Sequence, residues 1–63
     1  MVIGDTVRVL ISPPSWIPIK QYDEGTITGV LKQHYPYIVY FGDVDMYFGF
    51  LDSELELVKE RGY

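Results

Sequence analysis

The 63-residue chain contains no cysteine, a single histidine and only five basic residues. Without cysteine no disulfide can stabilise the fold, and this composition is typical of a reducing cytoplasm, where we expect the protein to reside. His34 alone cannot supply a zinc site, and no cofactor is expected. No apolar run approaches the roughly 20 residues of a membrane-spanning helix, so no membrane partner is expected either.

A chain of this length forms one domain and buries only about 60% of its unfolded surface. Because disulfides and metals are excluded, stability has to come from its aromatic residues or from self-association. Six tyrosines, three phenylalanines and one tryptophan are more than so small a core holds. Some of these rings should therefore lie outside the core, where rigid aromatics suit a protein interface.

Charge is distributed unevenly along the chain. Up to Phe41 the acidic and basic residues cancel, whereas the remainder carries six acidic residues against Lys59 and Arg61. This acidic half repels phosphates, so nucleic acid is not an expected partner. It favours a basic partner, or it is simply a solvated surface.

Two runs of β-branched and aromatic residues, Glu24–Lys32 and Tyr35–Phe41, predict a central β-hairpin. The polar pair Gln33-His34 separates them. Gly29, next to a break in the alternation at Val30, predicts a bulge or strong bend of the kind that small barrels need to close.

The other expected elements are a first strand within Met1–Ile11, a fourth strand at Met46–Leu51, a 3₁₀ turn at Asp52–Glu54 and a last strand at Leu55–Val58. In the first strand Val7, Val9 and Ile11 should share one face, and Thr6, Arg8 and Leu10 the other. Asp52 should cap the 3₁₀ turn. Together these elements predict an all-β fold, a five-stranded SH3-like small barrel over residues 1–58 with a polar tail at 59–63. An OB-fold, which needs longer strands, is the alternative.

The long first loop, Ser12–Asp23, contains three prolines that restrict its backbone. Ile17 and Ile19 should anchor it to the barrel. Trp16 either plugs one end of the core or is an exposed contact residue, since tryptophan is common at binding hot spots. Loops of this length are usually functional or disordered, and the apolar anchors argue against disorder.

Five short segments carry a resemblance: Gly4–Leu10, Pro14–Trp16, Glu24–Ile27, Tyr35–Phe41 and Leu51–Leu57. In this order they resemble segments of a known group of SH3-like barrels, the electron transport accessory proteins. This group includes the PsaE subunit of photosystem I and the variable chain of ferredoxin–thioredoxin reductase. The resemblance implies an SH3-like fold and a small subunit docked on a larger complex. Members that meet ferredoxin present basic residues around the first loop and third strand, where this chain has Lys20 and Tyr40.

No motif for chemistry stands out. Ser12, Ser15 and Ser53 lie in turns, and no nucleophile, base and orienting group follow a recognisable spacing. The chain is therefore not expected to be an enzyme by itself. One enzymatic alternative remains, because Val44–Tyr47 resembles a segment of type II dihydrofolate reductase, with Asp45 in place of a glutamine. That resemblance implies a homo-oligomer whose subunits share one active pore.

The leading hypothesis is a non-catalytic module that binds a protein partner through exposed aromatic rings. If Val39 and Phe41 face inward, alternation turns Tyr40 outward, and the same reasoning for Phe48 and Phe50 turns Tyr47 outward. A Tudor-like cage for methylated lysine, which needs three converging aromatic rings, is a further alternative. The candidate partner-binding residues are Trp16, Tyr22, Tyr40 and Tyr47.

Overall fold

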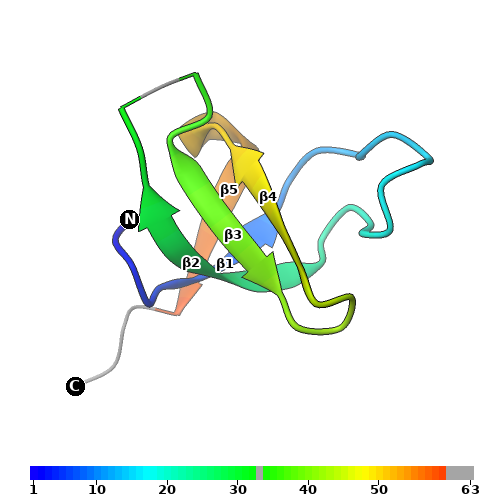
Figure 1. Ribbon diagram of the computed structural model, residues 1–63, viewed down its shortest axis with the longest axis horizontal. Coiled ribbons are helices and arrows are strands. Elements are labelled where there is room, and N and C mark those ends of the chain that lie inside the picture. The colour runs from blue at the N-terminus through cyan, green and yellow to red at the C-terminus, as the bar shows by residue number, and fades with distance from the viewer. Residues whose placement is uncertain (33, 60–63) are drawn as a thin grey trace.

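Five antiparallel strands form a single sheet in the computed structural model, which describes residues 1–32 and 34–59 (Figure 1). The strands lie in the order β4-β3-β2-β1-β5, so β4 and β5 are the two edges. The all-β prediction is confirmed for these residues, and the only helical element among them is one 3₁₀ turn. The elements are β1 (Thr6–Val9), β2 (Glu24–Val30), β3 (Tyr37–Phe41), β4 (Met46–Phe50), η1 (Asp52–Glu54) and β5 (Leu55–Lys59).

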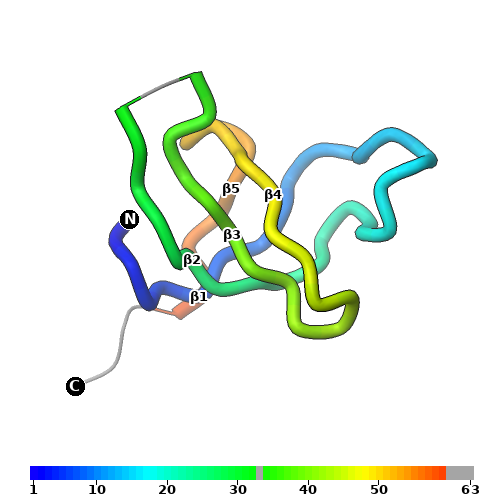
Figure 2. The backbone as a smooth tube through the Cα atoms, viewed as in Figure 1, coloured from blue at the N-terminus to red at the C-terminus, as the bar shows by residue number. Residues whose placement is uncertain are grey.

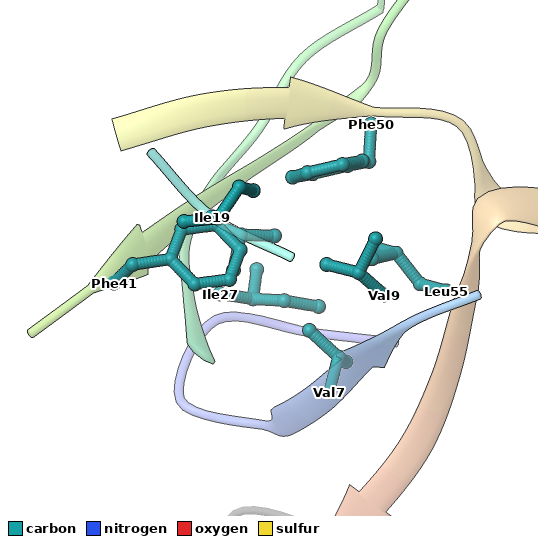
Figure 3. Packing of buried hydrophobic residues seen from close by; sticks show 8 residues of the cluster. Val7, Val9, Ile19, Ile27, Phe41, Phe50 and Leu55 are labelled. Carbon is teal, nitrogen blue, oxygen red and sulfur yellow. The ribbon is translucent and has the colours of Figure 1, made fainter. Parts of the chain in front are cut away.

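The core lies on the inner face of the curved sheet and receives side chains from every strand (Figure 3). Alternation places Val7 and Val9 of β1 inward, and both are fully buried. Phe41 contributes the largest fully buried side chain. One core residue, Ile19, comes from the first loop, which confirms that this side chain anchors the loop. The buried apolar cluster consists of Val7, Val9, Ile19, Ile27, Val39, Phe41, Phe50 and Leu55.

The central hairpin of β2 and β3 forms, although each strand is two residues shorter at the loop than predicted, and its bend falls close to the expected place. The pairing register shifts between Ile27 and Gly29, directly before the break predicted at Val30. Earlier in β2, Gly25 is required by close packing, since a Cβ atom there would lie 2.6 Å from Val39 Cγ1 and 2.7 Å from the Tyr40 carbonyl oxygen. The register shift near Gly29 bends β2, and a bend of this kind lets a small sheet curl around its own core.

The first strand is shorter than predicted. It ends at Val9, and the N–H of Leu10 donates to the Glu54 carbonyl of η1 at 2.8 Å. Ile11 is exposed and lies outside the strand, so the prediction that it shares a strand face with Val7 and Val9 is wrong. This bond continues the Val9–Leu55 pairing by one residue, and the pairing ends there because Glu54 belongs to the 3₁₀ turn rather than to a strand.

The 3₁₀ turn lies where the sequence predicts it, but its cap differs. Leu51 occupies the cap position, so the prediction that Asp52 caps the turn is wrong. The carboxylate of Glu54 reaches back and accepts a hydrogen bond from the Leu51 N–H at 2.7 Å. A glutamate three residues after the cap is well placed for this bond, and it satisfies a donor that the short turn leaves open.

The last strand runs one residue further than predicted, to Lys59, which pairs with Thr6 of β1. The rest of the predicted polar tail, 60–63, lies outside the described residues, as does Gln33 in the predicted hairpin loop.

Candidate partner-binding site

An apolar groove lies between the first loop and the free edge of β4. β3 pairs with one side of β4, and the first loop leaves β1 and projects on the other side (Figures 1 and 2). The groove has a volume of about 240 Å³. We call it the edge groove, and its lining residues are Ile11, Pro13, Pro14, Ile17, Ile19, Tyr35, Phe48, Gly49, Phe50 and Glu54.

Aromatic packing supports the β4 wall of the edge groove. The ring of Phe41 lies 6.1 Å from that of Phe48 and 6.0 Å from that of Phe50, centroid to centroid. Phe50 is buried, whereas Phe48 is half-buried and lines the groove. The groove therefore continues from the hydrophobic core, and its floor is held by core packing.

The opposite wall, formed by the first loop, is fixed by hydrogen bonds at its base. The Tyr22 N–H donates to the Val9 carbonyl at 2.7 Å, and the Val9 N–H donates to the Asp23 carbonyl at 2.9 Å. The side-chain amide of Gln21 donates to the Leu10 carbonyl. Because these bonds and the buried Ile19 already hold the loop, ordering it on binding costs little conformational entropy.

Acidic residues flank β4 at both ends. Asp43 and Asp45 precede the strand, while Asp52 and Glu54 follow it in η1. No basic residue lies in residues 43–54, and the other five acidic residues of the chain balance its five basic ones. The entire formal net charge of −4 thus belongs to the segment that contains β4 and its two ends.

The structure brings two of the four predicted site residues together. Tyr40 and Tyr47 are cross-strand neighbours on β3 and β4, with ring centroids 4.8 Å apart and planes tilted by 48°. The Tyr40 hydroxyl donates to Asp45 Oδ1 at 2.7 Å, and this bond is the main cause that raises the pKa of Tyr40. Asp45 adopts a left-handed backbone conformation in the β3–β4 turn, with φ of 52°. Tyr40 therefore also holds the turn.

The other two predicted residues lie on the first loop. Trp16 is 81% exposed and does not plug the core, while Tyr22 is 62% exposed and has a φ of 72°. No ring contact among the described residues joins either of them to the Tyr40–Tyr47 pair. A methyl-lysine cage needs a third ring, and within the described chain the pair has none in contact.

None of the four predicted residues lines the edge groove. The sequence did not predict the edge groove, because its walls come from segments about thirty residues apart. Two features of the sequence pointed toward it. The Pro13-Pro14 pair ends the strand pattern, and Phe48 is the one phenylalanine that the core does not bury.

Two features of other functional classes are absent from residues 1–32 and 34–59. No three His, Cys, Asp or Glu side chains gather there in a way that could hold a metal ion. In the same residues there is no helix long and apolar enough to cross a membrane.

Comparison of the chain with models of protein families, with curated proteins and with solved structures returned no match.

Proposed function

We propose that the protein is a non-catalytic, SH3-like protein-binding module, and that the edge groove receives an extended apolar segment of a partner protein. The observation that carries the proposal is an apolar groove with a fixed wall on each side. Grooves that exist before binding, with apolar walls and few polar groups, are the usual form of a binding site.

The assignment to SH3-like barrels rests on the connection between the two edge strands. A single 3₁₀ turn links β4 to β5, and Phe50 of β4 and Leu55 of β5 enter the same core. Both edge strands thus contribute side chains to one cluster, and this arrangement supports a small barrel. The strand order and the long first loop agree with this class.

Exposed apolar side chains near the groove support an interface rather than an ordinary surface. Ile11 and Leu51 are exposed, and Trp16 extends from the loop that forms one wall. Exposed tryptophan and clustered apolar side chains mark interaction sites more often than they mark inert surface.

The test uses peptides selected from a random displayed library against the wild-type protein. Ile11→Asp places a charge in the groove wall, outside any strand, and Ile3→Asp is the matched control at an exposed isoleucine away from the groove. We expect Ile11→Asp to abolish binding of the selected peptides and Ile3→Asp to leave it unchanged. Failure to select any peptide, or equal binding to both variants, would overturn the proposed function.

A further inference from the structure

The edge strand β4 lacks the features that usually prevent a bare strand from pairing. In the described chain its residues pair with β3 alone, and no backbone hydrogen bond joins them to another segment. The strand has no charge, no proline and no register shift against β3. Edge strands normally carry such features because an unpaired row of N–H and C=O groups recruits another strand.

The edge groove lies along this bare edge. Phe48, Gly49 and Phe50 of β4 line one side of it, opposite Pro14 and Ile17 of the first loop. In an antiparallel pair, alternate residues direct their backbone groups to one neighbour and the others point away. A segment lying in the groove therefore meets both apolar side chains and unpaired backbone groups.

Pairing of β4 with β4 of a second copy is opposed by charge. Antiparallel pairing centred on Phe48 would bring the Asp43–Asp45 end of one copy next to the Asp52–Glu54 end of the other. Each end then faces like charge, which makes this pairing between two copies unfavourable. The acidic residues at both ends thus disfavour pairing of β4 with a second copy, whereas a strand with basic ends can still pair with it.

We propose that the partner segment adds to β4 as an antiparallel strand, and that it has an apolar centre with basic residues at both ends. This inference rests on the proposed function and specifies its ligand. Strand addition supplies affinity through backbone hydrogen bonds, and side-chain pockets supply selectivity. Alternate side chains of the added strand enter the groove against Phe48, and the others lie beside Tyr47 on the outer face.

The charge of the ends selects the ligand. The carboxylates of Asp43 and Asp52 are exposed and make no hydrogen bond or ion pair in the described part of the chain, so a ligand lysine or arginine can approach them. Asp45 and Glu54 already accept hydrogen bonds from Tyr40 and Leu51. The two free carboxylates are therefore the groups to neutralise in a test.

The experiment measures binding of synthetic peptides of alternating valine and threonine that differ only in their flanking residues. With exposed ion pairs at both ends, we expect lysine flanks to bind about three- to tenfold tighter than serine flanks, and glutamate flanks to bind weakest. Added salt should reduce the difference. The double variant Asp43→Asn, Asp52→Asn should reduce the preference for lysine, whereas the matched double variant Glu24→Gln, Glu56→Gln, away from β4, should retain it.

Backbone N-methylation of the lysine-flanked peptide tests strand addition directly. Methylation of the alternate amides that face β4 should abolish binding, and methylation of the intervening amides should leave it unchanged. Equal effects of both sets, or equal affinity for all flanks, would overturn strand addition by a basic segment. If groove-dependent binding persists in that case, as judged by Ile11→Asp, the proposed function survives. If neither these peptides nor any peptide of the displayed library binds, both proposals fail.

Discussion

The two edges of the sheet, β4 and β5, differ in how they meet solvent. β5 carries Glu56 and Lys59, and its pairing with β1 is interrupted by a register shift between Thr6 and Val7. β4 is uncharged along its whole length and pairs with β3 in continuous register. One edge thus has the usual protection against added strands, and the other does not.

The difference extends to the outer face of the sheet. Arg8 lies between Glu24 of β2 and Glu56 of β5, at 2.9 and 2.8 Å, and ties β5 to the centre of the sheet. At the β4 edge the corresponding contact is the Tyr40–Tyr47 pair, which is apolar and leaves Tyr47 exposed. A single small sheet can therefore dedicate one edge to stability and leave the other for recognition.

The largest expected effect removes the support of β4 altogether. Phe41 is buried and contacts the rings of both Phe48 and Phe50. Phe41→Ala should lower the free energy of unfolding by about 3–5 kcal/mol, a large part of what a small domain has. Tyr47→Ala, on the exposed side of the same strand, should cost less than about 1 kcal/mol. Urea denaturation followed by circular dichroism measures both, and similar losses would show that Tyr47 belongs to the core.

A lysine introduced at each edge tests the comparison directly. Met46 of β4 and Leu57 of β5 are 43% and 42% exposed, so both substitutions should be tolerated by the fold. Met46→Lys should weaken binding of the lysine-flanked peptide about three- to tenfold, because like charge then faces the ligand. Leu57→Lys should leave it unchanged. Equal weakening by both, measured by titration calorimetry, would mean that the two edges do not differ as binding sites.

A smaller effect concerns the attachment of β5. Arg8→Met removes two exposed ion pairs and leaves Glu24 and Glu56 near each other. We expect a modest fall in melting temperature at low salt, and the difference from wild type should shrink as salt is added. Peptide binding at β4 should not change. A salt-independent loss would instead indicate that the apolar stem of Arg8 is what stabilises the edge.

The smallest effect concerns Tyr40 at alkaline pH. Its hydrogen bond to Asp45 raises the pKa of the phenol in the folded state above the ordinary value of 10.0. The resulting stability is fully present below the unfolded pKa and is lost as pH rises through the folded one. Wild type should therefore lose stability above pH 10 more steeply than Tyr40→Phe, with Tyr47→Phe as the control. Parallel pH profiles for wild type and Tyr40→Phe would contradict this role of the bond.

The sequence predicted local structure better than it predicted the surface. Alternation correctly placed Val39 and Phe41 in the core, and the Gly29 irregularity located the bend in β2. It failed at Ile11, because β1 ends where its partner segment becomes the 3₁₀ turn η1, and that segment lies far from β1 in the chain. Alternation also did not predict that Phe48 is half-buried while Phe50 is buried, because it assigns a face but not the depth of burial.

The sequence by itself determined that this chain is an all-β domain with a long anchored first loop, because strand alternation, turns and prolines act over a few neighbouring residues. It also determined that the second half is acidic. Only the tertiary structure decided that β4 is an edge, that Pro14 and Ile17 face it across a groove, and that the acidic residues stand at its two ends. The physical reason is that strand order and the approach of distant segments depend on long-range packing around a shared core, which no short stretch of sequence specifies.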